Sequence, residues 1–180
     1  MTAIPRGAVV WLTGLSGAGK STIADALAAE LMADGRGVAI VDGDELRRRS
    51  AHLGFDAASR EANIRRAAEL AEEGARDGQI VLVAVIAPFE RSRREAREIV
   101  EASVPFLLVW VRTPLAVAEA RDPKGLYARA RAGEIRDFTG IDSPYEEPLG
   151  ADLVIDTTVT TVPEAVTRIR RALEARLGDP

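Results

Sequence analysis

A glycine-rich segment at residues 14–21, G-L-S-G-A-G-K-S, most constrains what this 180-residue chain can fold into. It follows a short apolar run at residues 8–13 and precedes residues 21–33, whose apolar side chains recur at helical spacing. A strand, a loop of the form G-x-x-x-x-G-K-S/T and a helix together predict a phosphate-binding loop, or P-loop. Glycines let consecutive backbone N–H groups point at phosphate oxygens, and the helix N-terminus adds positive potential. The alternative, a glycine-rich turn that binds nothing, is disfavoured because both flanking elements are present.

The P-loop predicts where a nucleotide binds. We expect Lys20 to reach the β- and γ-phosphates of ATP and the Ser21 hydroxyl to ligate Mg²⁺. The other P-loop residues expected to contact the nucleotide are Gly14, Leu15, Ser16, Gly17, Ala18, Gly19 and Thr22. The motif is shared by GTPases, ATPase motors and small-molecule kinases. Since the chain has no N-K-x-D sequence for reading guanine, a compact kinase is favoured.

The rest of the chain alternates strands and helices. Apolar runs predict further strands at residues 38–41, 80–86, 105–111 and 153–156. Helices are predicted at residues 59–75, 89–100 and 163–177, and after residue 113. Ser59 is expected to be an incomplete cap of the first helix, and Thr113 to cap the helix that has Pro114 in its first turn. The alternation predicts an α/β protein with the P-loop NTPase fold: a five-stranded parallel sheet with helices on both faces.

Residues 124–150 interrupt this alternation and are rich in Gly, Pro, Asp and Arg. Ligands of parallel sheets bind at the carboxyl ends of the strands. A polar segment of this length in a small α/β domain is typical of a lid or a substrate loop. We therefore expect a single kinase domain over residues 1–180, with residues 124–150, the lid segment, over the substrate.

Composition excludes several classes of protein. Without Cys, the chain has no disulfides, thiolate metal sites or cysteine nucleophiles. The formal net charge of −4 argues against a nucleic-acid partner, and no apolar run is long enough to span a membrane. The first residues lack the pattern of a signal peptide, so a cytoplasmic location is expected.

Two acidic residues follow the predicted strand at residues 38–41. Asp42 and Asp44 end a strand that should face the P-loop, where a carboxylate can hold Mg²⁺ or accept a hydroxyl proton. We expect Asp44 to orient the hydroxyl that accepts the phosphate. The alternative is a turn with a helix N-cap, since Asp-Gly-Asp is also good turn chemistry. The two roles are compatible.

Six motifs occur in order along the chain. They are G-L-S-G-A-G-K-S-T at 14–22, D-G-D-x-x-R at 42–47, L-G-F at 53–55, R-x-x-N at 60–63, R-D-x-K-G-L-Y at 121–127 and F-T-G-I-D-x-P-Y-E at 138–146. Together they resemble the adenylylsulfate kinase family over nearly the whole chain. The last two motifs are far more specific than a P-loop.

The resemblance implies transfer of the ATP γ-phosphate to the 3′-hydroxyl of adenosine 5′-phosphosulfate. Phe55 and Phe138 would sandwich the acceptor's adenine. The resemblance gives the remaining acceptor contacts to Asp42, Asp44, Arg47, Arg60, Asn63 and Lys124. By the same resemblance, the catalytic residues would be Asp44, Lys20 and Lys124. Mg²⁺ would be bound by Ser21 and Asp44, and ATP would also contact Arg121. Arg129 and Arg136 are weaker candidates for offsetting charge on the transferred group.

The sequence also departs from the family. Where relatives have a serine before a proline, this chain has Ala87, so a phosphoserine step is excluded and direct in-line transfer is expected. Residues 48–52 differ from the usual stretch, which leaves open a kinase of the same fold with another small-molecule hydroxyl as acceptor. A non-catalytic nucleotide-binding partner of a sulfate-activating complex is a further alternative. A homodimer and a sulfate adenylyltransferase partner are expected by resemblance only.

Two groups of residues are assigned structural roles. Tyr145 and Glu146 are expected to shape the lid segment rather than to act chemically. Four arginines crowd residues 91–97, and we expect a solvated charged face paired with nearby glutamates, namely Glu90, Glu95 and Glu98.

Overall fold

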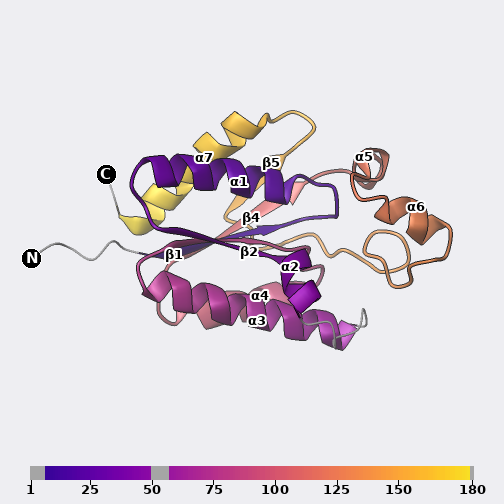
Figure 1. The fold of residues 1–180 in the computed structure, drawn as a ribbon, viewed down its shortest axis with the longest axis horizontal. Coiled ribbons are helices and arrows are strands. Elements are labelled where there is room, and N and C mark those ends of the chain that lie inside the picture. The colour runs from indigo at the N-terminus through magenta and orange to yellow at the C-terminus, as the bar shows by residue number, and fades with distance from the viewer. Residues whose placement is uncertain (1–6, 50–56, 179–180) are drawn as a thin grey trace, which may run out of the picture.

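The computed structural model describes residues 7–49 and 57–178, which form one parallel sheet covered by helices (Figure 1). The strands are β1 (Ala8–Thr13), β2 (Val38–Asp42), β3 (Ile80–Ala84), β4 (Phe106–Arg112) and β5 (Leu153–Asp156). They pair in the order β2-β3-β1-β4-β5, and all four pairs are parallel. The predicted fold class is confirmed. Because β1 is the central strand, the P-loop that follows it starts from the middle of the sheet's carboxyl edge.

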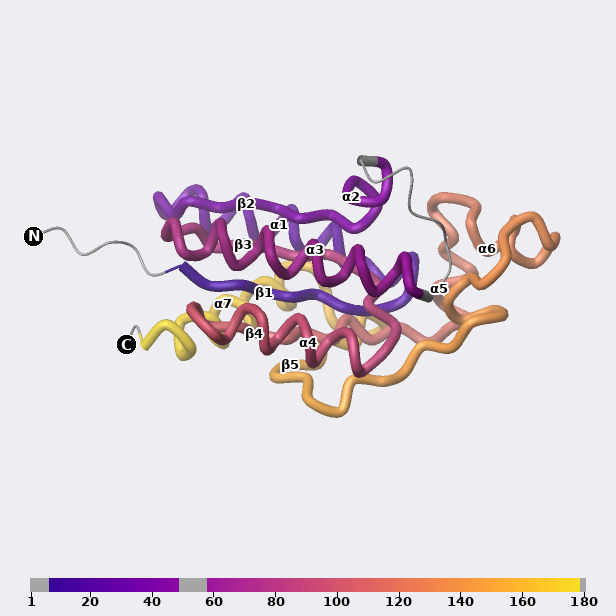
Figure 2. Tube along the Cα trace, turned by 90° about the horizontal axis from the view of Figure 1, so that it is seen from below, coloured from indigo at the N-terminus to yellow at the C-terminus, as the bar shows by residue number. Residues whose placement is uncertain are grey.

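Two long helices cover each face of the sheet, and short helices lie at its carboxyl edge, opposite the first residue of β1 and the last turn of α7 (Figures 1 and 2). One face carries α1 (Lys20–Ala33) and α7 (Val162–Leu177), and the other carries α3 (Ala57–Arg76) and α4 (Glu90–Glu101). The short helices are α2 (Gly43–Arg49), α5 (Leu115–Arg121) and α6 (Leu126–Arg131). Over residues 7–49 and 57–178, no helix has the length and apolarity needed to cross a membrane.

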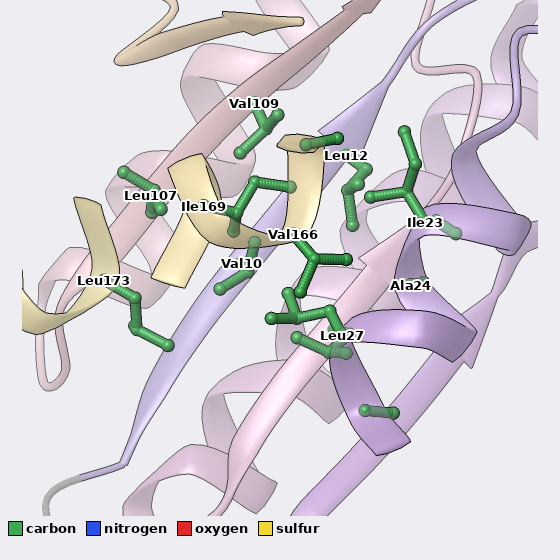
Figure 3. Close-up of a cluster of buried hydrophobic side chains, with 14 of the residues drawn as sticks. Val10, Leu12, Ile23, Ala24, Leu27, Leu107, Val109, Val166, Ile169 and Leu173 are labelled. Atoms are coloured by element: carbon green, nitrogen blue, oxygen red, sulfur yellow. The ribbon is translucent and has the colours of Figure 1, made fainter. Parts of the chain in front are cut away.

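The core has two halves because side chains of a strand alternate between the faces of its sheet. From β1, Val10 and Leu12 pack against α1 and α7, where Leu27 and Ile169 are fully buried (Figure 3). On the opposite face the buried Trp11 lies among small and aliphatic residues of α3 and α4. All six residues of β1 are buried, which explains why the five residues before Thr13 are all apolar.

The capping residues predicted from local sequence are wrong for two helices. Helix α3 begins at Ala57, before Ser59, so the prediction of Ser59 as its cap is wrong. For α5 the N-cap residue is Pro114, and no side chain caps the helix. The Thr113 hydroxyl instead contacts the Ala18 carbonyl at 3.4 Å and the Thr157 hydroxyl at 2.6 Å. Thr113 therefore ties the P-loop to the segment after β5, a use that local sequence does not reveal.

Candidate active site

Lys20 lies inside the P-loop. Its ammonium group donates to the carbonyl oxygens of Gly14 at 2.9 Å and Leu15 at 2.8 Å. Burial lowers the pKa of Lys20 to about 8, although the negative charges of Asp44 and Asp42 oppose that shift. A phosphate group in the loop would favour the charged form, because an opposite charge at short distance stabilises an ammonium ion.

Asp42 connects the P-loop to the start of α2. Its Oδ2 atom accepts a hydrogen bond from the Ser21 hydroxyl at 3.0 Å. Its Oδ1 atom accepts from the backbone N–H groups of Asp44 at 2.9 Å and Glu45 at 3.2 Å. The helix-capping interpretation of Asp42 is therefore confirmed, and the same carboxylate keeps one oxygen beside Ser21.

Asp44 forms an ion pair with Lys124, so helix α2 and the turn before α6 meet at this point. Burial alone would raise the pKa of Asp44. The hydrogen bond and charge of Lys124 outweigh burial, together with the charges of Arg47 and Lys20, and the pKa falls below its usual value. Asp44 is thus held as a carboxylate, the state that can accept a proton or bind a cation.

A cleft of about 740 Å³ brings most of the predicted residues together at the carboxyl edge of the sheet. Those that line it are Ser16, Gly17, Gly19, Lys20, Ser21, Thr22, Asp42, Asp44, Arg47, Arg60, Asn63, Lys124 and Phe138. The arginines Arg129 and Arg136 of the lid segment also line it. Two segments that are far apart in sequence, the P-loop and the lid segment, therefore share one cavity.

Some predicted residues lie elsewhere. Gly14 and Leu15 do not line the cleft but supply the carbonyl oxygens that hold Lys20, and Ala18 is buried behind the loop. The Arg121 guanidinium lies outside the cleft and donates to the hydroxyl and carbonyl oxygens of Thr157, at 3.1 and 3.2 Å. Phe55 falls outside the described residues.

Asp142, which sequence reasoning missed, organises the lid segment around Phe138. Its carboxylate accepts from the backbone N–H groups of Asp137 at 2.8 Å and Phe138 at 2.5 Å. Asp137 has a φ of 55°, a left-handed conformation that asparagine and aspartate tolerate better than most residues. The next residue, Ser143, accepts a hydrogen bond from Arg60 of α3 at 3.1 Å. The spacing of Phe138 and Asp142 within one motif was the available signal.

Arg93 is buried, with 1% of its side chain exposed, so the predicted solvated face is wrong for this residue. Its guanidinium donates to the carbonyl oxygens of Ala87 and Glu146, both at 2.7 Å, and to Glu90 Oε2 at 2.6 Å. It also lies 5.7 Å from the centre of the Tyr145 ring. Arg93 therefore joins the segment after β3, which forms part of the cleft wall, to the end of the lid segment.

The other arginines of α4 are at least partly exposed. Arg91 pairs with Glu61 of α3, Arg94 with Glu98 and Arg97 with both Glu101 and Asp152. Most of these partners are not the ones expected: Glu61 lies on α3, beside α4 (Figure 2), and Asp152 lies just before β5. Local sequence does not show which residue of a neighbouring helix is within reach.

We expect Arg93→Ala to lower the free energy of unfolding by about 3 kcal/mol, because it leaves buried acceptors without their donor. Urea unfolding followed by circular dichroism measures this change. Arg94→Ala is the matched control on the same helix. Its exposed pair with Glu98, at 4.0 Å, contributes little, so its unfolding free energy should stay close to the wild-type value. Equal losses in both variants would contradict the assigned role of Arg93.

The cleft offers oxygen ligands that suit Mg²⁺. The Ser21 hydroxyl and the carboxylates of Asp42 and Asp44 all line it. Within residues 7–49 and 57–178, no cluster of three or more acidic or histidine side chains is placed to hold a metal ion. The oxygen donors of Ser21, Asp42 and Asp44 fit Mg²⁺, which proteins usually bind through one or two carboxylates while substrate phosphates and water complete its coordination.

A P-loop after the central strand β1, sharing one cleft with carboxylates at the carboxyl end of β2, defines a P-loop phosphotransferase. The family described as adenylylsulphate kinase matches residues 6–156. The chain belongs to this family, whose members are ATP-dependent kinases.

Three relatives document the similarity. The adenylyl-sulfate kinase of Paraburkholderia xenovorans (strain LB400) is 54% identical over 165 residues, which cover 91% of each chain. The Mycobacterium tuberculosis APS kinase CysC in complex with AMPPNP and APS superposes with a TM-score of 0.91 at 44% identity, over 94% of this chain and 99% of that one. The hexameric APS kinase from Thiobacillus denitrificans gives a TM-score of 0.72 at 37% identity, over 96% of this chain and 29% of that one.

Proposed function

We propose that this protein transfers the γ-phosphate of ATP to the 3′-hydroxyl of adenosine 5′-phosphosulfate, giving 3′-phosphoadenosine 5′-phosphosulfate. The observation that carries the proposal is the shared cleft, in which Lys20 and Asp44 lie together with Arg47, Arg60 and Phe138. The first two suit phosphoryl transfer, and the last three suit an anionic nucleotide. Similarity to a kinase solved with both AMPPNP and APS supports the choice of substrates.

On the ATP side, P-loop N–H groups and Lys20 would bind the phosphates and offset charge as the γ-phosphate transfers. Ser21 and Asp42, joined at 3.0 Å, and Asp44 would hold Mg²⁺. When bound, this ion neutralises charge on the phosphate oxygens. Asp44, kept ionised beside Lys124, would orient the acceptor hydroxyl and take its proton.

On the acceptor side, Arg47 and Arg60 carry guanidinium groups whose planar forks suit the phosphosulfate oxygens. Asn63 lies one helical turn after Arg60 on α3, and both line the cleft. Phe138 would stack on the acceptor's adenine. The partner ring expected from Phe55 stays a prediction, since that residue lies outside the described part of the chain.

A panel of acceptors tests the proposal. The protein is incubated with MgATP and, separately, with adenosine 5′-phosphosulfate, AMP, adenosine, a hexose and gluconate, and ADP release is measured. Of these acceptors, we expect only adenosine 5′-phosphosulfate to give substantial ADP release. Indifference to that compound with activity on another alcohol would favour a different acceptor, and ATP binding without any product would favour a non-catalytic module.

We expect Phe138→Ala to raise the KM for adenosine 5′-phosphosulfate about tenfold, because stacking of one base on an aromatic ring contributes roughly 1–3 kcal/mol. Initial-rate kinetics at saturating ATP measure this effect. Phe89→Ala serves as the control, since Phe89 precedes α4 and does not line the cleft. An unchanged acceptor KM in Phe138→Ala would argue against stacking.

Several features of the whole protein remain predictions. We propose that residues 1–180 act as one kinase domain, with residues 124–150 serving as a lid. The hexameric relative makes self-association a reasonable expectation, and the homodimer is its simplest form. The cytoplasmic location and a sulfate adenylyltransferase partner rest on the sequence and the family resemblance alone.

A further inference from the structure

A small apolar cluster, separate from the two halves of the main core, joins the P-loop to the lid segment. Its buried members are Leu15 of the P-loop, Ala118 of α5 and Tyr127 of α6. Partly buried residues pack against them, namely Leu115, Phe138, Ile141 and Tyr145. The two segments approach closely here, because a Cβ atom on Gly140 would lie 2.9 Å from Leu115 and 3.4 Å from Leu15. Movement of one segment is therefore resisted by the other.

Tyr127 is the member of this cluster that touches both sides of the cleft by specific contacts. Its hydroxyl donates to the carbonyl oxygen of Ser16, in the P-loop, at 2.8 Å. Its ring meets the ring of Phe138, in the lid segment, edge to face with centres 5.0 Å apart. Ser16 and Phe138 line the cleft, whereas Tyr127 does not, and only 1% of Tyr127 is exposed.

The position of Tyr127 is fixed from two directions. The Asp122 carboxylate accepts from the backbone N–H groups of Tyr127 at 3.1 Å and Ala128 at 3.0 Å, which holds the start of α6. Burial raises the pKa of Tyr127 to about 12, so its hydroxyl keeps the proton that it donates to Ser16 at neutral pH. Tyr127 thus has little freedom to move independently of either contact.

We propose that Tyr127 is a positioning residue that couples nucleotide binding at the P-loop to acceptor binding at Phe138. Phosphate oxygens that bind the loop's N–H groups fix the peptide units around Ser16. Because the Tyr127 hydroxyl is bonded to the Ser16 carbonyl, fixing Ser16 also fixes Tyr127 and the start of α6. The Tyr127 ring packs against Phe138 and so fixes the face that Phe138 presents to the acceptor. A contiguous, packed path of this kind is a physical route for energetic coupling between two sites.

The inference rests on the proposed function, and one substitution isolates the contact. Tyr127→Phe removes the hydrogen bond to Ser16 but keeps the ring that packs against Phe138. The chain supplies a matched control, since its only other tyrosine is Tyr145. Tyr145→Phe deletes a hydroxyl that contacts Thr13 at 3.0 Å and does not touch the P-loop backbone. Both variants retain the apolar part of the side chain, so both should fold.

The experiment measures affinity for adenosine 5′-phosphosulfate by calorimetry, with and without saturating AMPPNP and Mg²⁺. The ratio of the two affinities is the coupling between the sites. We expect AMPPNP to strengthen acceptor binding to the wild type, and Tyr127→Phe to reduce that ratio about fivefold, the change expected from loss of one ordinary hydrogen bond. Tyr145→Phe should keep the wild-type ratio.

The inference is overturned by a wild-type ratio of one, by an unchanged ratio in Tyr127→Phe, or by an equal reduction in Tyr145→Phe. A merely structural role for Tyr127 would lower both affinities and leave their ratio intact, which also contradicts the inference. Absence of adenosine 5′-phosphosulfate binding to the wild type in both states is a distinct result. It contradicts the proposed acceptor, and with it the inference.

Discussion

Replacing Lys20 with alanine is expected to reduce turnover by roughly 100-fold or more, the loss seen when one donor is removed from a preorganised site. Lys20 is the buried cation of the P-loop, and two loop carbonyls hold its ammonium group 2.8–2.9 Å away. No other described lysine or arginine lies within the loop. Its removal therefore deprives the transferred phosphate of a positive charge at a buried position, where a charge acts more strongly than it does in water.

The measurement is kcat at saturating ATP and adenosine 5′-phosphosulfate, with circular dichroism to confirm that the variant is folded. Arg66→Ala is a suitable control, because Arg66 is an exposed cation of α3 that pairs with Glu69 away from the cleft. That control should retain wild-type turnover. Near-wild-type turnover of Lys20→Ala would show that the P-loop assignment is wrong.

Asp44→Asn is expected to lower kcat about 100-fold, at the lower end of what a positioned general base contributes. The amide keeps the size of the side chain but can neither take the acceptor's proton nor balance the charge of Lys124. Since the P-loop is unchanged, affinity for AMPPNP without Mg²⁺, measured by calorimetry, should stay close to that of the wild type. The control is Glu45→Gln, because Glu45 pairs with Arg48 and does not line the cleft.

The pH dependence of turnover, compared between the wild type and Lys124→Met, provides a second test of Asp44. The pKa of Asp44 lies below its usual value, so the carboxylate stays ionised into the acidic range and activity should persist there. Lys124→Met removes a charge that lowers this pKa. The acid limb of the kcat/KM profile should then move to higher pH. Full activity in Asp44→Asn, or an unmoved acid limb in Lys124→Met, would contradict the role of Asp44 as base.

The sheet and the P-loop were predictable because their signals are local. Each strand is a short apolar run, and the G-x-x-x-x-G-K-S pattern carries both its turn chemistry and its ligand chemistry. Five strands were predicted, and the described residues contain the same five, with ends shifted by at most two residues. Helices α2 and α6 were missed because seven and six residues are too few to show a helical period.

The contacts that shape the cleft were less predictable because they join distant residues. Arg93 is buried by contacts with Ala87 and with Glu146, which lies 53 positions further along the chain. The hydroxyl of Tyr127 meets a carbonyl 111 positions earlier. Periodicity on one helix does not indicate such partners, so an arginine that holds the cleft wall looks the same in sequence as its exposed neighbours.

The family motifs identified most of the residues that line the cleft, but they did not show which motif residues point elsewhere. Arg60, Asn63 and Phe138 come together as the resemblance implied. Arg121 belongs to an equally specific motif, yet its side chain binds Thr157 outside the cleft. A motif identifies a residue but not its contacts, because the contacts of that residue depend on how the surrounding segments pack.

The proposed reaction requires that one cleft bring the ATP γ-phosphate to the 3′-hydroxyl of adenosine 5′-phosphosulfate. Product analysis tests it directly: the protein is incubated with MgATP and adenosine 5′-phosphosulfate, and the nucleotide product is purified and examined by phosphorus–proton NMR. We predict equimolar ADP and a product whose new phosphate is coupled to the ribose 3′ proton. A phosphate on any other atom, or no phosphorylated product from protein that binds ATP, would contradict the account.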